Sequence, residues 1–245
     1  MIPISMEHQI LITLDIDWAP DFMINFVKDI LIENNVKATW FITHNSNYVK
    51  ELEKNELFEL GIHPNFSGDS TQGNNIEGIL SNLKKIVPTA KSVRTHGLYQ
   101  STRILEQFHK YRLENDVSLF IPDSNITPHY LKFAKLYRFP YFWEDDINMI
   151  EDKIWSLPES LFQEDGLKIF NFHPLHIYFN FHNIEQYENF KTKNGYEFSD
   201  KSALDTFINK NSDGARTFFR DLVSALANKQ TSYTIQEIKT KIFNS

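Results

Sequence analysis

The chain has no cysteine, which excludes disulfides, thiolate chemistry and cysteine-ligated zinc sites. It has no apolar run approaching the roughly 18 residues that a membrane-spanning helix needs, and no long cluster of Lys or Arg that would suit nucleic acid. Residues 1–17 lack a basic segment before their apolar run, which a carboxylate interrupts, so we interpret them as leading into a first strand and not as a signal peptide. These absences favour a cytoplasmic protein with no transmembrane segment and no nucleic-acid partner.

The composition is that of an ordinary globular protein. The 245 residues are 41% hydrophobic and 23% charged, with a net charge of −7, which suits one domain over residues 1–245. Short apolar runs alternate with longer amphipathic segments. The strand-like runs are 10–14, 36–43, 60–64, 91–97, 116–121, 137–143, 167–173 and 232–238, and the helical segments are 21–33, 45–58, 75–87, 101–111 and 203–227. This alternation predicts an α/β fold of parallel βαβ units, either a barrel or a doubly wound sheet.

The first strand-like run ends in "ILITLDIDWAPD", where two carboxylates stand two residues apart. Side chains at i and i+2 of a strand share a face, so we expect Asp15 and Asp17 to lie close together. Unpaired, they would repel each other and be costly to desolvate. A cation beside them is the simplest remedy, and two ordinary acids in a solvated loop are the alternative.

Polar side chains also follow the other predicted strands, and α/β folds build their sites at the carboxyl ends of strands. These side chains are His44, His63, Arg94 with His96, the acids at 144–146, and His173 with His176. Five of the nine histidines lie in such positions, which chance placement explains poorly. The set suggests a divalent metal with mixed N and O ligands and a separate acid–base pair.

Five short motifs, taken in order, resemble the polysaccharide deacetylase (NodB-type) family of carbohydrate esterases. They are "TLDID", "KATWF", "ELGIH", "SVRTHG" and "FNFHP", and "TSYTIQEI" resembles the closing strand of that family. The resemblance spans most of the chain and implies a distorted (β/α) barrel of about seven parallel strands. The variants "HPNF", "RTHG" and "FHPLH" are similar to a subgroup associated with O-antigen and other surface-polysaccharide clusters.

The resemblance implies a role for each matching residue. Asp15 matches the general base and Asp17 the metal-binding carboxylate. His63 matches the first metal histidine, Arg94 the residue that holds the base, and His173 the histidine that protonates the leaving amine. These roles agree with the chemistry of hydrolysis, in which one group takes a proton from water and another gives one to nitrogen.

The sequence departs from the family pattern at two places. The second metal histidine of the family falls on Ser67, which is a poor ligand for a divalent ion. We expect His96 to supply the missing ligand, with His44 as the reserve candidate. In addition, Ile16 separates two acids that are adjacent in the family, which makes the exchange of roles between them an open question.

Four further residues are candidates for the site. Asp145 is expected to hydrogen-bond His173 and fix its tautomer, although a solvated loop is the alternative. Trp18 and Trp143 could form an apolar pocket for the acyl group, or simply belong to the core. His176 could line the site or position the segment that follows it.

That segment, residues 179–201, is predicted to be a long loop. It places aromatic side chains among Asn, Glu and Lys directly after the last motif. Long loops are often lids or substrate walls, and rings among polar groups suit a sugar. A loop folded onto the barrel would have the same composition.

Together these features predict a metal-dependent hydrolase that removes an N-acetyl or similar acyl group from a sugar, with Zn²⁺ as the expected metal. The substrate could be an acetylated sugar, a nucleotide sugar, a lipid-linked glycan or a polymer. Two other readings stay open. One is a catalytically silent glycan-binding domain that lost its metal with the change at Ser67, and the other is a deacylase of a small non-sugar amide.

Overall fold

The structure is a computed structural model that describes residues 9–124 and 126–243. Residues 1–8, 125 and 244–245 lie outside the described part. The interpretation that the chain does not begin with a signal peptide concerns residues 1–17, so much of that segment lies outside the described residues. Among the described residues no helix combines the length and the apolar character needed to cross a membrane.

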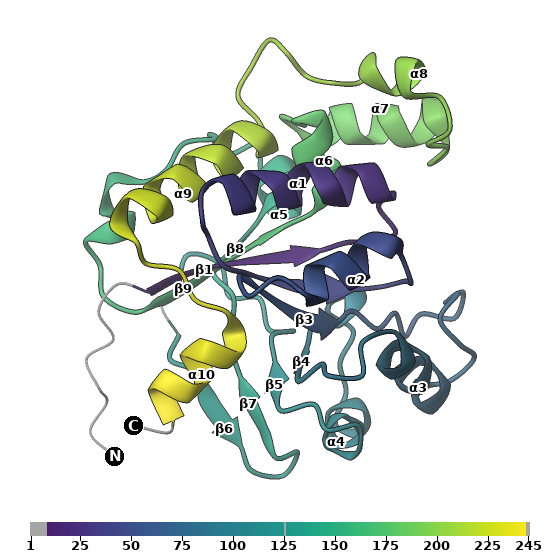
Figure 1. Cartoon of the computed structure of the whole chain (residues 1–245), viewed down its shortest axis with the longest axis vertical. Helices are drawn as coiled ribbons and strands as arrows, with labels where there is room; N and C mark the ends of the chain where they lie inside the picture. The colour runs from purple at the N-terminus through teal and green to yellow at the C-terminus, as the bar shows by residue number, and fades with distance from the viewer. Residues whose placement is uncertain (1–8, 125, 244–245) are drawn as a thin grey trace.

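Strands and helices alternate along most of the chain (Figure 1). The strands are β1 (Gln9–Asp15), β2 (Ala38–Ile42), β3 (Phe58–Ile62), β4 (Ser92–Val93), β5 (Asn115–Asp116), β6 (His129–Leu131), β7 (Leu136–Arg138), β8 (Trp143–Glu144) and β9 (Leu167–Phe172). The helices are α1 (Asp21–Glu33), α2 (Asn47–Glu53), α3 (Ile76–Ile86), α4 (Thr102–Lys110), α5 (Asp145–Ile150), α6 (Pro174–Phe179), α7 (Ile184–Asn194), α8 (Lys201–Asp205), α9 (Ala215–Lys229) and α10 (Ile235–Phe243), with 3-10 turns at His96–Leu98 and Glu159–Phe162.

The strands form one curled sheet in the order β6-β7-β5-β4-β3-β2-β1-β9-β8. Every pair is parallel except β6 with β7. The segment from β7 to β8 bridges the two sides of the curled sheet. Tyr141 N donates to Leu119 O (2.9 Å), which follows β5, and Phe142 N donates to Ile169 O (2.9 Å) of β9. These bonds draw the sheet into the distorted (β/α) barrel that the sequence predicted, within a single α/β domain.

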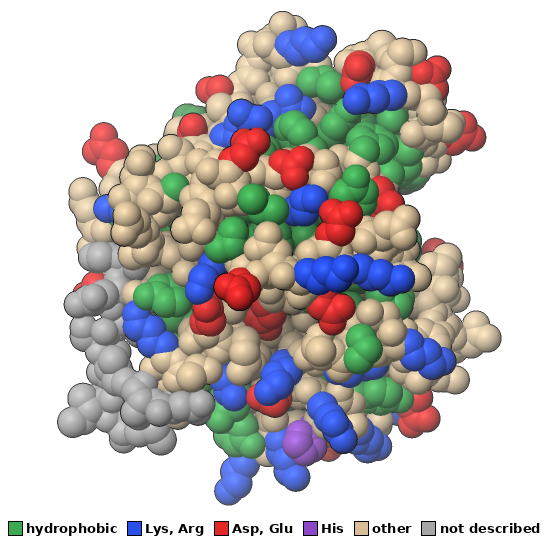
Figure 2. Space-filling model, viewed as in Figure 1, with side chains coloured by type: hydrophobic (Ala, Val, Ile, Leu, Met, Phe, Trp, Pro, Cys, Tyr) green, Lys and Arg blue, Asp and Glu red, His purple; other side chains and the backbone are tan. Residues whose placement is uncertain are grey.

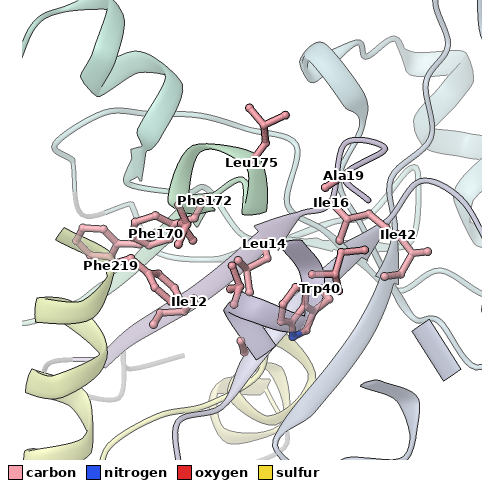
Figure 3. Packing of buried hydrophobic residues seen from close by; sticks show 14 of the residues in the cluster. Ile12, Leu14, Ile16, Ala19, Trp40, Ile42, Phe170, Phe172, Leu175 and Phe219 are labelled. Atoms are coloured by element: carbon pink, nitrogen blue, oxygen red, sulfur yellow. The ribbon is translucent and has the colours of Figure 1, made fainter. Parts of the chain in front are cut away.

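Alternation along β1 separates the outside of the barrel from its inside. Ile10, Ile12 and Leu14 belong to the large core that the helices cover, together with Trp40 and the phenylalanines of β9 (Figure 3). Leu11 faces the other way, into a smaller apolar cluster, as the two-residue period of a strand requires. Asp15 shares that inward face and therefore stands at the upper end of the lumen.

The lower end of the lumen is closed by α10, where the sequence analysis predicted a strand over 232–238. That prediction was wrong. Ile235 and Ile238, three residues apart on one helical face, are both buried in the inner cluster. Thr234 and Glu237 form a capping box, in which each side chain accepts from the other's backbone N–H (3.3 and 3.0 Å). The Thr-x-x-Glu signature was the available signal for a helix start.

Residues 179–201 are not the long loop that was predicted, because the eleven residues of α7 lie within them. Asn183 caps the helix by accepting from Gln186 N (3.1 Å), and Gly195 ends it with φ +57°. The buried rings of this region stabilise the fold: they are Phe179, Phe181 and Phe190. Only the outer residues of α7 are left to meet a substrate.

Candidate functional site

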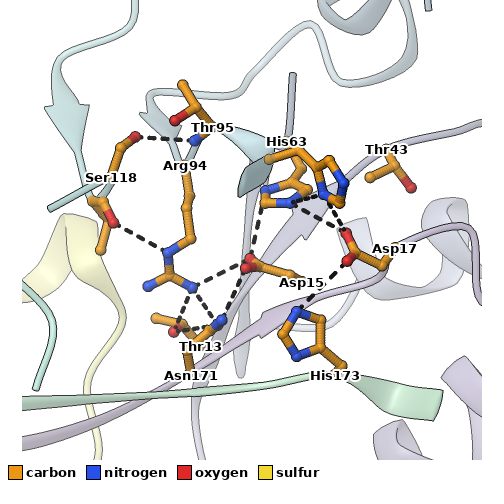
Figure 4. A network of polar contacts seen from close by, with 12 residues as sticks. Thr13, Asp15, Asp17, Thr43, His63, Arg94, Thr95, Ser118, Asn171 and His173 are labelled. Carbon is orange, nitrogen blue, oxygen red and sulfur yellow. Dashed lines mark hydrogen bonds and ion pairs between the residues drawn. The ribbon is translucent and has the colours of Figure 1, made fainter. Parts of the chain in front are cut away.

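The site lies where the parallel strands end at the top of the lumen (Figure 4). Asp15 is the last residue of β1, while His63 and His173 directly follow β3 and β9. In the close-up, Asp15 lies between Arg94 and His63, and Asp17 lies between His63 and His173. The structure therefore brings together side chains that are up to 158 positions apart in the sequence, as the rule for strand ends anticipated.

A buried ion pair forms the floor of the site. The Arg94 side chain is fully buried, and its Nη1 lies 3.2 Å from Asp15 Oδ1. The guanidinium stacks between the rings of Phe41 (4.6 Å) and Tyr141 (4.5 Å). Opposite Phe41 stands Gly61, where a Cβ would come within 2.7 Å of the Phe41 ring, so only glycine leaves that ring in place.

Asn171 is a member of the site that the sequence analysis missed. Its Nδ2 donates to Asp15 Oδ2 (2.9 Å), and its Oδ1 accepts from Arg94 Nη1. The amide thereby holds both partners of the ion pair. The available signal was a polar residue in the buried run "LKIFNF", at a position facing the lumen.

Asp17, His63 and His96 form a compact group of three possible metal ligands. Asp17 Oδ1 lies 3.2 Å from His63 Nε2 and 3.3 Å from His96 Nδ1, and the two histidine nitrogens lie 3.3 Å apart. Nitrogen ligands about 2.0–2.1 Å from a tetrahedral zinc ion lie roughly 3.3 Å from one another. Within the described residues Asp17 Oδ1, which faces both histidines, has no hydrogen bond of good geometry, so the donors present fit a divalent cation.

Electrostatics favour the charged form of the carboxylate in this group. Burial by itself raises the pKa of Asp17, but the imidazoles of His63 and His96 outweigh it and hold that pKa well below its usual value. The pKa of His96 is raised, mainly by its contact with Asp17. An anionic Asp17 beside two imidazoles is the donor set that zinc prefers.

The expectation that Asp15 and Asp17 share a strand face was wrong. β1 ends at Asp15, and Ile16 is fully buried. Asp17 and Trp18 lie in a turn with φ values of +36° and +55°, a conformation that is rare for residues other than glycine. The turn, and not the two-residue period of the strand, directs Asp17 toward the histidines.

Opposite the ion pair, His173 is held by Asp145. The backbone N of His173 donates to Asp145 Oδ2 (2.8 Å), and its Nδ1 lies 2.6 Å from Asp145 Oδ1. Burial lowers the pKa of His173, but the carboxylates of Asp145 and Asp146 more than compensate and raise it well above its usual value. His173 Nε2 then faces Asp17 Oδ2 at 3.6 Å.

His176 joins this acid–imidazole group from α6. Its Nδ1 lies 3.3 Å from Asp145 Oδ2 and its Nε2 lies 3.5 Å from Asp146 Oδ1. Tyr187 of α7 covers it, with ring centroids 5.0 Å apart, and the Tyr187 hydroxyl lies 2.9 Å from that of Tyr196. The segment 179–201 thus reaches the site through Tyr187.

Three residues that the sequence analysis considered lie elsewhere. Trp143 is packed in the core, 4.6 Å from the Phe218 ring, and its Nε1 donates to Asn148 (3.2 Å), so the structure does not support it as part of an acyl pocket. His44 pairs with Thr43 Oγ1 (2.9 Å) and is outside the metal-ligand group. Ser67 is exposed and bonds Asn65 and Asp69. Trp18, by contrast, contacts His96 edge-on at 5.3 Å.

Glu144 was named among the acids that follow a predicted strand, but the sequence analysis gave it no role. Its Oε1 accepts from Asn171 Nδ2 (3.2 Å), and its Oε2 accepts from the Tyr141 hydroxyl (3.1 Å). Atoms of Glu144, Asp15 and His173 lie within 4.8 Å of one another. Burial raises the pKa of Glu144 to about 7, although the charge of His173 acts in the opposite direction, so this carboxyl is largely protonated below neutral pH.

The curled parallel barrel, with its site at the strand ends, defines the architecture of the NodB-type deacetylases. A family model described as "WbmS-like: Polysaccharide deacetylase" matches residues 12–191. The chain belongs to this family of polysaccharide deacetylases, which confirms the resemblance seen in the motifs.

Solved structures agree. A putative polysaccharide deacetylase involved in O-antigen biosynthesis from Bordetella bronchiseptica is 33% identical, with a TM-score of 0.81 over 90% of this chain and 91% of that one. A putative polysaccharide deacetylase from Mycobacterium smegmatis is 12% identical, with a TM-score of 0.61 over 98% and 93% of the two chains, and shows the fold alone. A search of curated proteins returned no match.

The raised pKa of Glu144 makes a prediction about stability. A carboxyl that binds its proton more tightly in the folded state contributes stability that is fully present below its ordinary pKa of 4.5 and is lost as the pH rises through the folded value. Glu144→Gln stays neutral, so thermal unfolding of the chelator-treated variant should depend less on pH between about 5 and 7 than that of the wild type. The exposed Glu159→Gln serves as control, and parallel curves for Glu144→Gln and wild type would contradict the raised pKa.

Proposed function

We propose that this polysaccharide deacetylase is a metal-dependent hydrolase that removes an N-acetyl or similar acyl group from a sugar of a surface polysaccharide. The observation that supports it most is the convergence of Asp17, His63 and His96 between two other groups, the Asp15–Arg94 pair and the Asp145–His173 pair. A metal site, a buried base and an imidazole acid are the parts that amide hydrolysis requires.

The residues that would hold the cation are Asp17, His63 and His96, with Zn²⁺ as the expected ion. When bound, such a cation would polarise the acyl carbonyl and make water more acidic. We expect His96 to act in place of the histidine that the family pattern has at position 67. Its Nδ1 lies 3.3 Å from both Asp17 Oδ1 and His63 Nε2, which supports an active enzyme over the silent glycan-binding domain. Nothing in the site favours a small non-sugar amide.

Asp15 is placed to accept the proton of the attacking water. Arg94 and Asn171 fix both of its carboxylate oxygens, so its orientation does not depend on the substrate. The water oxygen forms a bond to the acyl carbon as its proton passes to Asp15. The guanidinium of Arg94, held between two aromatic rings, supplies the counter-charge to this carboxylate at 3.2 Å.

His173 is placed to protonate the leaving nitrogen. Asp145 accepts from Nδ1, which fixes the tautomer and leaves Nε2 directed into the site. As the bond between the acyl carbon and nitrogen breaks, the Nε2 proton passes to nitrogen and the amine leaves. The products are the free amino sugar and the carboxylic acid.

The biological setting is also part of the proposal. The Bordetella bronchiseptica protein that is 33% identical is described as involved in O-antigen biosynthesis, and this supports a surface polysaccharide as the substrate. The cytoplasmic location expected from the sequence stays a prediction, which cell fractionation would check.

The first prediction of this proposal concerns the metal. Loss of a group that merely orients a ligand costs about 10- to 100-fold in metal affinity, so His96→Ala should weaken Zn²⁺ binding by at least that much. Titration calorimetry on the apo protein measures the change. His44→Ala is the matched control and should bind Zn²⁺ as the wild type does; the reverse pattern would assign the third ligand to His44.

The second prediction concerns the base. Asp15→Asn should lower the rate of acetate release from N-acetylhexosamine oligosaccharides by about 10² to 10⁴ fold, while bound metal and the circular dichroism spectrum stay unchanged. Asn keeps the shape of the side chain but cannot accept the proton. The exposed Asp152→Asn should retain full activity. Loss of metal from Asp15→Asn would instead make Asp15 a ligand.

The third prediction tests whether residues 179–201 form a substrate wall. If Tyr187 stacks against the sugar, Tyr187→Ser should raise KM for an oligosaccharide roughly fivefold, equivalent to about 1 kcal/mol of ring contact. Hydrolysis of 4-nitrophenyl acetate, which is too small to reach α7, should be unchanged. Tyr130→Ser, on the distant strand β6, is the control. Equal losses on both substrates would show that Tyr187 supports the fold and not the substrate.

A further inference from the structure

The hairpin of β6 and β7 lies at the end of the barrel opposite the site. β7 runs parallel to β5 and follows the turn at residues 132–135, so this turn lies where the parallel strands begin. In Figure 1 the hairpin reaches the lower edge of the molecule, where β7 also contacts α4 and α10. A partner bound at the hairpin would leave the site, which lies where the strands end, uncovered.

The hairpin exposes a group of large apolar side chains. Phe133 in the turn is 52% exposed, Tyr130 on β6 is 47% exposed, and Ile126 before the strand is 38% exposed. Eight large apolar side chains are exposed among the described residues, and these three lie within a span of eight positions. Tyr130 packs on the ring of Tyr137 with centroids 4.9 Å apart, which holds it at the surface. Exposed apolar side chains that are gathered in this way mark an interaction surface.

The charge of this segment is opposite to that of the chain as a whole. Residues 124–143 contain three Lys or Arg and no Asp or Glu, in a chain with a net charge of −7. Arg138 pairs with Asp116 Oδ2 at 2.7 Å. Lys132 and Lys135, by contrast, are exposed and form no ion pair within the described part of the chain. The hairpin therefore presents two unpaired cations next to its exposed rings.

Further cations lie at the same end of the barrel. Lys110 ends α4 and Arg112 follows it, and both side chains are exposed. Because α4 leads into β5, which neighbours β7, these two residues lie where β5 begins. On the face drawn in Figure 2, Lys and Arg side chains gather over the lower end of the molecule. A partner with an anionic surface would suit this end.

The open edge of β6 is poorly suited to a second copy of the chain. β6 pairs with β7 alone in the sheet, and an open edge can add a strand. However, β6 is only three residues long, and Pro128 directly before it has no N–H to donate. Two copies joined here would also bring their unpaired lysines together, and like charges repel each other.

We infer that the β6–β7 hairpin docks the protein on an anionic lipid bilayer, with the rings of Phe133 and Tyr130 among the headgroups and the two lysines beside lipid phosphates. Aromatic side chains favour the boundary between water and lipid. Binding of a peripheral protein grows with the apolar area that enters this boundary and with its attraction to anionic lipids. Docking of this kind does not depend on the proposed hydrolysis.

Co-sedimentation of the full chain with vesicles tests the inference. Phosphatidylcholine vesicles that contain about 30% phosphatidylglycerol should bind the protein roughly tenfold or more tightly than phosphatidylcholine alone. NaCl at about 1 M should release it, because the screening length is then only about 3 Å. Lys132→Ala/Lys135→Ala should weaken binding about 25-fold, since each cation near such a surface contributes roughly fivefold. Lys201→Ala/Lys210→Ala removes the same charge at and beyond α8 and should bind as the wild type does.

The absence of cysteine in the chain allows a second measurement at single positions. Phe133→Cys, labelled with the environment-sensitive dye NBD, should shift its emission to shorter wavelength when anionic vesicles are added. Tyr196→Cys replaces a ring of similar exposure, 47%, in the segment that follows α7. Its label should keep the emission that it has in water.

Three results would overturn the inference. They are a wild-type protein that does not prefer anionic vesicles, a Lys132→Ala/Lys135→Ala protein that binds as tightly as its control, and a Phe133 label whose emission does not change. A dimer in analytical ultracentrifugation that Tyr130→Asp dissociates, without vesicle binding, would assign the hairpin to a second copy of the chain. Acetate release from a soluble oligosaccharide should be equal for Lys132→Ala/Lys135→Ala and wild type. If neither protein releases acetate but the wild type still prefers anionic vesicles, the proposed hydrolysis fails and the docking surface stands.

Discussion

The burial of Arg94 inside the barrel is the constraint on which the rest of the site depends. A guanidinium removed from water is costly unless it is paired and hydrogen-bonded. Asp15 supplies the counter-charge at 3.2 Å, Thr13 accepts from Nη1 at 2.9 Å, and the Val117 carbonyl accepts from Nε at 3.1 Å. Thr13 and Asp15 lie on β1 and Val117 directly follows β5, so the guanidinium links two sides of the barrel and fixes the carboxylate at the same time.

Much of this arrangement was predictable because it follows from strand ends. Parallel strands place their carboxyl ends at one edge, so polar residues after successive apolar runs had to meet there. Asp15, His63, Arg94 and His173 were identified in this way, and the family resemblance supplied their proposed roles. The departure at Ser67 was also visible in the sequence, and His96, which we propose as the replacement ligand, lies just beyond the neighbouring strand β4, 3.3 Å from His63.

What could not be predicted depends on turns and on packing between distant segments. Asp17 reaches the histidines through two left-handed residues, which nothing in "DIDW" signals. Trp143 begins β8, directly before the acids at the site, but Phe218, far along the chain, packs against it and keeps it in the core. The capping residues of α7 and α10 are present in the sequence. The interpretation gave more weight to the aromatic residues near α7, which suggested a loop, and to the β-branched residues near α10, which suggested a strand.

The position of His96 has a consequence for the surface beside the site. His96 follows Arg94 by two residues, and its backbone N donates to Pro64 O (3.0 Å), so one short segment carries both the partner of Asp15 and a possible metal ligand. In the proposed site, the chain after His63 does not supply a second ligand. Gln72 instead ties this segment down by donating to the His63 and Thr43 carbonyls, each at 3.0 Å. Asn82 of α3 donates to Gln72 O (2.9 Å), so a segment that carries a metal ligand in the family pattern packs against α3 in this chain and lines a pocket with Trp18 and His44.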